Sequence, residues 1–204
     1  MKALQELQVG GHWALVGRKG EYAAGNGAAM RIAPLSFFLD PFSFTDRLLI
    51  RDVCRITHHN EEAYAGAMAI VLAIHFFLTQ IEKGVVNFLD YIINELPDSN
   101  TRDRLGAMAN KPNKEIAEIA STYGVSAYVA ESVPFAVFAA SKIFTSDFKS
   151  ILEQIVSCGG DTDTNSAMAG QIIGTYLGEK EIPLILSEKL ATTNFPQLFD
   201  GLID

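Results

Sequence analysis

Apolar residues recur at helical spacing through most of this sequence, and this restricts the folds that it can adopt. One stretch places five of them at i, i+3, i+4, i+7 and i+8, on one face of a helix: Phe148, Ile151, Leu152, Ile155 and Val156. We find no clean run with a period of two residues, no hairpin dipeptide and no internal repeat. The sequence therefore predicts an all-α protein, a compact helical bundle that forms one domain over residues 1–204. Predicted helix caps are Thr45, Asn60 and Ser146. Helices are predicted over 61–80, 83–96 and 125–144, and the tail, 181–204, is predicted to be a last short helix and an apolar-anchored end.

Composition and charge exclude several classes of protein. The chain has 16 Lys and Arg against 24 Asp and Glu, a net charge of −8, and no basic run, which argues against a nucleic-acid surface. Cys54 and Cys158 give no disulfide framework and fit a reducing cytoplasm. The longest apolar run, 63–78, is interrupted by Gly66 and His75 and is predicted to be too short to span a bilayer. We expect a cytoplasmic protein without nucleic-acid or membrane partners.

A turn rich in carboxylates and hydroxyls joins two predicted helices, over 146–156 and 167–177. We call it the acidic turn, and its residues 159–165 read Gly159-Gly160-Asp161-Thr162-Asp163-Thr164-Asn165. Asp161 and Thr164, three residues apart, can project to the same side once the second helix begins. Asp163 joins them if the two glycines let residue 161 lie outside the regular helix. Three oxygen ligands would then converge.

Two interpretations of the acidic turn follow from spacing alone. Converging carboxylate and hydroxyl oxygens suit an oxygen-preferring divalent cation such as Mg²⁺, Mn²⁺ or Ca²⁺. Aspartates at the start of a helix are also common as caps on a solvated turn, because free N–H groups and the helix dipole favour negative charge there.

A second glycine-rich segment, residues 25–31, precedes the predicted helices. We call it the glycine loop, and it reads Gly25-Asn26-Gly27-Ala28-Ala29-Met30-Arg31. Its glycines permit positive φ, so successive backbone N–H groups could form an anion-binding nest, and Arg31 could contact a phosphate or carboxylate. The alternative is a tight turn with a structural arginine. The adjacent His58 and His59 point apart and have no third ligand at helical spacing, so we predict no transition-metal site there.

The acidic turn, extended to Gly170, resembles the C-terminal signature of the ADP-ribosylglycohydrolase family, to which the dinitrogenase reductase activating glycohydrolase and the ADP-ribosylserine hydrolases belong. The glycine loop resembles a second signature of that family, a loop that lines the ADP-ribose pocket. Thr57-His58 is similar to a pair that reaches this pocket. Family members often have Ser where this chain has Ala23, which would remove one hydroxyl contact to the diphosphate.

The resemblance implies an all-α hydrolase that cleaves the N- or O-glycosidic bond between ADP-ribose and a protein side chain or small acceptor. It implies Mg²⁺ or Mn²⁺ as cofactor, held by Asp161, Asp163 and Thr164. The residues that it implies for binding ADP-ribose or an ADP-ribosylated protein are Gly25, Asn26, Gly27, His58, Gly159 and Gly160. It does not identify a general base.

The chain also departs from the family pattern. Family members carry a Gly-Asp-Ala-Leu-Gly segment and a Thr-Asp-Asp-Thr motif upstream, which supply further metal ligands; the nearest string here, Thr45-Asp46-Arg47, looks like a helix cap. Two divalent cations about 3.5–4 Å apart need more anionic ligands than Asp161 and Asp163 provide, so we expect one weakly bound metal or none.

Three expectations follow for the function. The first is a hydrolase lacking the N-terminal helices and completed by a second chain or by self-association at the face those helices would cover. The second is a catalytically inactive member that binds ADP-ribose or serves structurally. The third, a mimic of the Asp-x-Asp-x-Thr nucleophile of haloacid-dehalogenase-type phosphatases, is disfavoured because those aspartates follow a strand near the N-terminus.

Overall fold

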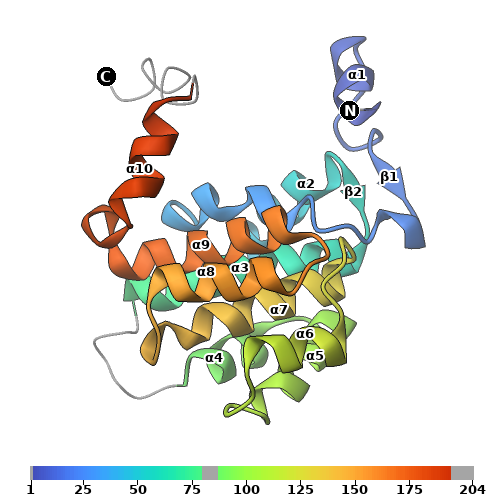
Figure 1. Cartoon of the computed structure of the whole chain (residues 1–204). Helices are drawn as coiled ribbons and strands as arrows, with labels where there is room; N and C mark the ends of the chain where they lie inside the picture. Colours follow the sequence, from blue (N-terminus) through green and yellow to red (C-terminus); the bar gives the residue numbers. More distant parts are fainter. Residues whose placement is uncertain (1, 80–86, 194–204) are drawn as a thin grey trace.

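The computed structural model describes residues 2–79 and 87–193 of the chain and shows a helical protein (Figure 1). The α-helices are α1 (Lys2–Gln8), α2 (Phe44–Arg55), α3 (Glu61–Thr79), α4 (Phe88–Glu95), α5 (Asn100–Ala109), α6 (Ile116–Tyr123), α7 (Val129–Ser141), α8 (Phe148–Ser157), α9 (Thr162–Leu177) and α10 (Leu184–Ala191). The 3-10 helices are η1 (Glu21–Ala23), η2 (Ala29–Arg31), η3 (Ala33–Phe37), η5 (Lys142–Phe144) and η6 (Glu179–Glu181). The predicted all-α class is confirmed.

A small sheet among the described residues was not predicted from the sequence. Strands β1 (Arg18–Lys19) and β2 (His58–His59) pair in parallel, with Arg18 opposite His58 and Lys19 opposite His59. Each strand has two residues, which is too short to show a period of two in the sequence. The sheet brings the segment before the glycine loop next to the end of α2.

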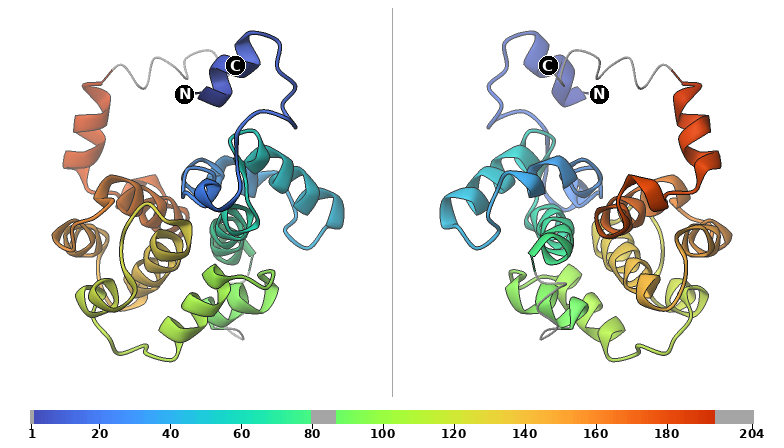
Figure 2. Two further views of the ribbon diagram at one scale, coloured as in Figure 1. Left: turned by 90° about the vertical axis from the view of Figure 1, so that its right-hand side faces the viewer. Right: turned by 90° about the vertical axis from the view of Figure 1, so that its left-hand side faces the viewer.

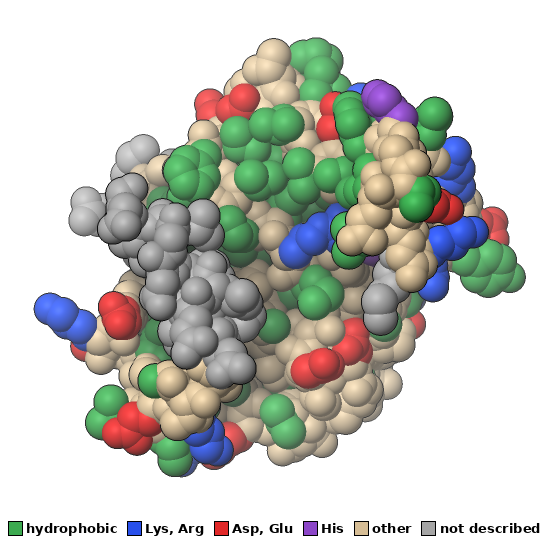
Figure 3. All heavy atoms as spheres, turned by 90° about the horizontal axis from the view of Figure 1, so that it is seen from above, with side chains coloured by type: hydrophobic (Ala, Val, Ile, Leu, Met, Phe, Trp, Pro, Cys, Tyr) green, Lys and Arg blue, Asp and Glu red, His purple; other side chains and the backbone are tan. Residues whose placement is uncertain are grey.

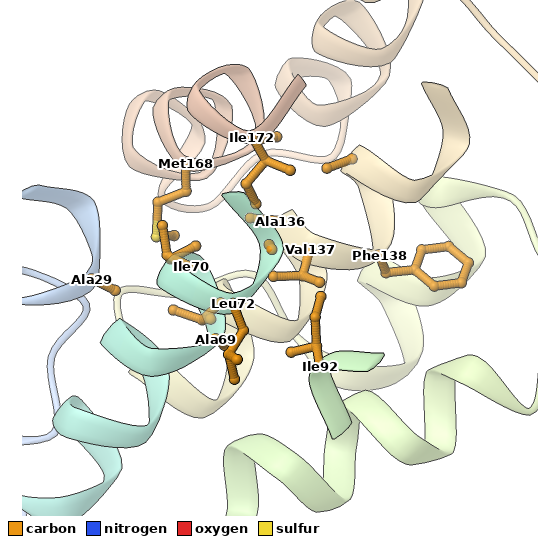
Figure 4. Close-up of a cluster of buried hydrophobic side chains, with 14 of the residues drawn as sticks. Ala29, Ala69, Ile70, Leu72, Ile92, Ala136, Val137, Phe138, Met168 and Ile172 are labelled. Carbon is orange, nitrogen blue, oxygen red and sulfur yellow. The ribbon is translucent and has the colours of Figure 1, made fainter. Parts of the chain in front are cut away.

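The core lies where α3, α7 and α9 pack side by side (Figure 2). Ile70 and Leu72 of α3, Val137 of α7, and Met168 and Ile172 of α9 all point into one cluster and are fully buried (Figure 4). Burying a side chain of this size contributes about 1.5–3 kcal/mol relative to leaving it in water. These three helices therefore form the rigid support from which the loops at their ends project.

Helix α3 is long and apolar enough to cross a membrane if judged by length and composition alone. It has 19 residues, so the prediction that this run is too short was wrong. However, 72% of its apolar window is buried inside the protein, against α7 and α9 among others. Its hydrophobicity is explained by its place in the core.

Several helix boundaries differ from the predicted ones. The cap of α8 is Asp147, whose carboxylate accepts the Ser150 N–H, and not Ser146. The cap of α2 is Ser43 and not Thr45. In both places neighbouring residues are equally good caps, so local sequence does not choose between them. By contrast, the predicted cap Asn60 is confirmed, because its side-chain oxygen accepts the N–H groups at the start of α3.

The predicted helix over 125–144 begins later than expected. α7 starts at Val129, and residues 124–128 form a loop, which we call the bridging loop. Gly124 ends α6 with φ of +85°, a conformation that glycine adopts without strain. The bridging loop then runs towards the glycine loop, and it is the segment that assembles the candidate site.

Two terminal helices and an apolar face lie outside the core. Helices α1 and α10 project from the same end of the bundle (Figure 1). Helix α10 is the last short helix predicted for the tail, and it has no buried residue. The remainder of the predicted tail, 194–204, and the start of the helix predicted from Lys83 lie outside the described residues.

Exposed aromatic side chains lie at the end of η3 (Ala33–Phe37). Phe37 is 58% exposed and Phe38 82% exposed, beside a groove of about 550 Å³ that α9 also lines. Figure 3 shows hydrophobic side chains gathered on the end of the molecule from which α1 and α10 project. Apolar patches of this kind often mark interaction sites. Self-association of the chain, or its contact with a complementing chain, stays a prediction.

Candidate functional site

Three segments that are far apart in the sequence are hydrogen-bonded together at one end of α9. The Asp161 N–H donates to the Val125 carbonyl at 3.0 Å, and the Asn26 N–H donates to the Ala127 carbonyl at 3.1 Å. The Asn26 side-chain N–H donates to an Asp161 carboxylate oxygen at 2.6 Å. The acidic turn and the glycine loop are therefore in contact, and each also donates one backbone N–H to a carbonyl of the bridging loop.

The three predicted oxygen ligands lie in the first turn of α9. Asp161 is the N-cap residue, with φ of −84° and ψ of 64°, and so lies outside the regular helix as predicted; the helix begins at Thr162. Hydrogen bonds to the Asp163 carboxyl, first from the Thr164 N–H and then from the Asp161 carboxyl, lower the pKa of Asp163. The side chains of Asp161 and Asp163 thus touch, while Thr164 is 8% exposed beside them.

These three side chains are the ones that could hold a divalent cation. Two carboxyls in contact repel one another when both are ionised, and a cation between them removes that repulsion. Asp161 and Asp163 supply two carboxylates and Thr164 a hydroxyl, which are oxygen donors of the kind that Mg²⁺ and Mn²⁺ prefer. Within residues 2–79 and 87–193, no group of three or more His, Cys, Asp or Glu could hold a metal. The donor set therefore fits one cation better than two.

The glycines of the acidic turn have different surroundings. Gly159 and Gly160 both have φ of +72°, in the region that favours glycine. A Cβ on Gly160 would lie 2.5 Å from the Val125 carbonyl oxygen, whereas a Cβ on Gly159 would have no atom within 4 Å. Gly160 therefore allows the close approach of the acidic turn to the bridging loop.

The glycine loop does not have the backbone that the sequence predicted. Gly25 and Gly27 are not among the described residues with positive φ, and the Asn26 N–H is already bonded to Ala127. The reason for glycine is instead the closeness of His58. A Cβ on Gly27 would lie 2.9 Å from His58 Cε1, and a Cβ on Gly25 would lie 3.3 Å from His58 Nε2. The glycine loop therefore does not form the predicted anion-binding nest; its backbone at Gly25 and Gly27 lies against the His58 imidazole.

Arg31, Thr57 and His58 form a chain of hydrogen bonds under the glycine loop. Arg31 donates to the Gly27 carbonyl at 2.6 Å, to the Val53 carbonyl at 3.2 Å and to the Thr57 hydroxyl at 2.6 Å, which is the structural role left open above. The Thr57 hydroxyl lies 2.7 Å from His58 Nδ1. Since that hydroxyl accepts from Arg31, we assign it as the donor to Nδ1, which leaves the proton of the neutral His58 on Nε2.

Burial, together with the charges of Arg31 and Arg18, lowers the pKa of His58 to about 4. The imidazole is therefore neutral near pH 7 and offers Nε2–H as a donor. A cavity of about 740 Å³ adjoins it, and its lining includes Gly27, Arg31, Thr57 and His58. Lys2, Arg18 and Lys19 also line this cavity, against one carboxylate, that of Glu6, so its lining is basic. An anionic ligand is the kind that such a cavity favours.

The depressed pKa of His58 predicts how stability depends on pH. In the unfolded chain His58 has its ordinary pKa of 6.5, so between pH 6.5 and about 4 the unfolded chain binds a proton that the folded chain does not. The stability that neutral His58 contributes is complete above pH 6.5 and is lost as the pH falls towards 4. We expect the wild-type Tm to fall more steeply over this range than that of His58→Gln, as followed by circular dichroism. Parallel curves would show that His58 titrates normally.

The sequence missed the residues that assemble this site. The bridging loop was predicted to be helical, and Glu131, whose carboxylate binds Ser126 of that loop, was not singled out. One signal was available: Glu131 lies in the first turn of α7, where an acidic side chain can reach back to N–H groups before the helix.

Comparison with known proteins identifies the family of this chain. The sequence profile of the ADP-ribosylglycohydrolase family matches residues 1–204. The chain belongs to the ADP-ribosylglycohydrolase family. The predicted resemblance is thereby confirmed, and with it the expectation of the helical fold of this family.

Individual relatives of this ADP-ribosylglycohydrolase-family chain come from animals, archaea and bacteria. ADP-ribosylhydrolase ARH3 of Bos taurus is 29% identical, over 81% of this chain and 52% of its own length. An uncharacterized protein of Archaeoglobus fulgidus is 30% identical, over 85% of this chain and 55% of its own. The Escherichia coli protein YegU, also uncharacterized, is 29% identical, over 83% and 55%. The chain spans about half the length of the curated relatives that it matches.

Proposed function

We propose that this chain binds ADP-ribose, free or attached to a protein, and takes part in hydrolysis of its glycosidic bond with the help of Mg²⁺ or Mn²⁺. The observation that carries the proposal is the hydrogen bond from Asn26 to Asp161. It joins the two segments that resemble the family signatures, although they are 135 residues apart in the chain. Membership of the ADP-ribosylglycohydrolase family and the similarity to ADP-ribosylhydrolase ARH3 support the choice of substrate.

In this proposal Asp161, Asp163 and Thr164 hold the cation. Asn26 fixes the Asp161 carboxylate by donating to one of its oxygens, which leaves the remaining lone pairs for the metal. A bound Mg²⁺ or Mn²⁺ would act as a Lewis acid for ribose hydroxyls and water. Gly159 and Gly160 let the acidic turn bend, and Gly160 also lets it approach the bridging loop.

The ligand would occupy the basic cavity beside the glycine loop. Gly27 lines this cavity, and its neighbours Gly25 and Asn26 would extend the wall. The absence of side chains on the two glycines would allow a diphosphate to approach the backbone. His58 would donate Nε2–H to a ligand oxygen, because its neutral state and its bond to Thr57 keep that proton in place. We assign no general base.

A second candidate function is binding of ADP-ribose without catalysis. It is favoured by the small donor set, since the described residues offer no group of three or more acidic, His or Cys side chains for a metal. A single cation held by two carboxylates could orient a ligand and still be insufficient for hydrolysis.

The two candidates are separated by one pair of measurements on the same protein. Calorimetry with ADP-ribose in the presence of Mn²⁺ should detect binding, and incubation with an ADP-ribosylated peptide should release ADP-ribose if the chain is a hydrolase. Binding without release would favour the second candidate. The absence of both would refute the proposed function. His58→Phe is a suitable variant for both assays, because it removes the Nε2–H donor.

A further inference from the structure

The bridging loop is shared by both halves of the site, and a single carboxylate holds it. Its Val125 carbonyl accepts the Asp161 N–H at 3.0 Å and the Asn165 side-chain N–H at 3.1 Å. Its Ala127 carbonyl accepts the Asn26 N–H at 3.1 Å. A displacement of this loop would therefore move the acidic turn and the glycine loop together.

Glu131 fixes the bridging loop from the first turn of α7. One of its carboxylate oxygens accepts the Ser126 hydroxyl at 2.7 Å and the Ser126 N–H at 3.2 Å. The same Ser126 hydroxyl accepts the Tyr128 N–H at 3.2 Å. The side chain of Glu131 is 24% exposed, so these bonds are partly shielded from water. They connect the loop to a helix whose other residues form the core.

Arg104 of α5 completes this arrangement. Its guanidinium lies 3.7 Å from the second carboxylate oxygen of Glu131, donates to the Tyr123 carbonyl at 3.0 Å, and lies over the Tyr128 ring at 5.8 Å from the centroid. The first residue of the loop is constrained as well, since a Cβ on Gly124 would lie 2.5 Å from a carboxylate oxygen of Glu131. The loop is thus held at both ends and in the middle.

We propose that Glu131, supported by Arg104, is a positioning residue for the site: through the bridging loop it sets the distance between Asn26 and the Asp161–Asp163 pair. Its effect on ligands rests on the function proposed above. Glu131 itself touches neither the acidic turn nor the glycine loop in the contacts described. Removal of its carboxylate should therefore weaken binding of both the cation and ADP-ribose, although no residue that would contact either of them is removed.

Glu62 provides a matched control. Like Glu131, it accepts backbone N–H and hydroxyl groups: its carboxylate accepts the backbone and side-chain N–H groups of Asn100 and the N–H and hydroxyl of Thr101, at the start of α5, at 2.7–3.1 Å. It joins two helices and does not line the basic cavity. Glu131→Ala and Glu62→Ala should therefore both lower the stability of the protein by a similar amount. A change in amide exchange or Mn²⁺ affinity that occurs only in Glu131→Ala is then due to the place of Glu131 beside the bridging loop.

Two measurements test the proposal on the full chain. In the absence of metal, amide hydrogen exchange at Asn26 and Asp161 should become faster in Glu131→Ala and should not change in Glu62→Ala. Calorimetry should show Mn²⁺ affinity lowered by roughly 10–100-fold in Glu131→Ala, as is typical when a residue that orients metal ligands is removed. Glu131→Gln retains an acceptor for Ser126 and should restore part of the affinity.

The outcomes distinguish this inference from the proposed function. If wild type does not bind Mn²⁺ or ADP-ribose but exchange at both amides still rises in Glu131→Ala, the proposed function fails and the positioning role stands. Unchanged exchange at both amides in Glu131→Ala would overturn the positioning role. Ser126→Ala, which removes only the shared hydroxyl, gives the same test if Glu131→Ala does not fold; unchanged exchange in it would also count against the inference.

Discussion

Gly160→Ala should abolish Mn²⁺ binding, whereas Gly159→Ala should preserve it. Both residues have φ of +72°, so each alanine introduces backbone strain, which costs on the order of 1–3 kcal/mol. Only the Cβ at position 160 meets other atoms, with the Val125 carbonyl oxygen at 2.5 Å and Val125 Cγ2 at 2.7 Å. Because that carbonyl accepts the Asp161 N–H, relief of the overlap must separate the acidic turn from the bridging loop.

The comparison is best made by thermal unfolding with and without Mn²⁺. Gly159→Ala should lower Tm by about 2–4 °C per kcal/mol of strain and keep the upward shift that Mn²⁺ produces. Gly160→Ala should lower Tm further and lose that shift. If both variants keep the full shift, the approach of the acidic turn to Val125 is not needed for the cation.

A second pair of glycine substitutions should change stability in opposite directions. Gly66 lies in α3 where it crosses α7, and a Cβ there would overlap Cγ2 of the buried Val129 and lie 3.2 Å from Val133 Cγ2. Overpacking of this kind costs about 1–3 kcal/mol, because β-branched side chains in a dense core cannot easily rotate away. Gly66→Ala should therefore destabilise the protein.

Gly174→Ala is the control, since Gly174 lies in the last turn of α9 and a Cβ there would have no atom within 4 Å. Alanine in a helix is favoured over glycine by about 0.5–1 kcal/mol, so this variant should be more stable than wild type. Urea unfolding of the two variants provides the measurement. A gain of stability in Gly66→Ala would show that α3 and α7 are not in the close contact described.

The helices could be predicted from the sequence because the pattern that defines them is local. The spacing of Phe148 and Ile151 places both on the buried face of α8, as the structure confirms. Helix starts were less certain, since Asp147 and Ser146 are both good caps and only the surrounding fold selects one. Contacts between a helix and the rest of the fold decide which residue caps it, and the local sequence does not show these contacts.

The candidate site was predictable only in part, for a related reason. The hinge before Asp161 follows from two consecutive glycines, and the structure has the backbone they allow. The meeting of Asn26 with Asp161 depends on the path of the chain between them, and no local pattern encodes it. Gly25 and Gly27 were predicted to be glycines because of positive φ, but the structure explains them by the closeness of His58. The sequence does not show that His58 lies against them.

The most direct test is a calorimetric titration of wild type and Asp163→Ala with Mn²⁺. Asp163 is exposed at the start of α9, so its replacement should remove only a favourable charge at the helix N-terminus and leave the fold intact. We expect wild type to bind one Mn²⁺ per chain and the variant, with an unchanged circular dichroism spectrum, to bind none. Equal binding by both proteins would contradict the assignment of the cation to Asp161, Asp163 and Thr164.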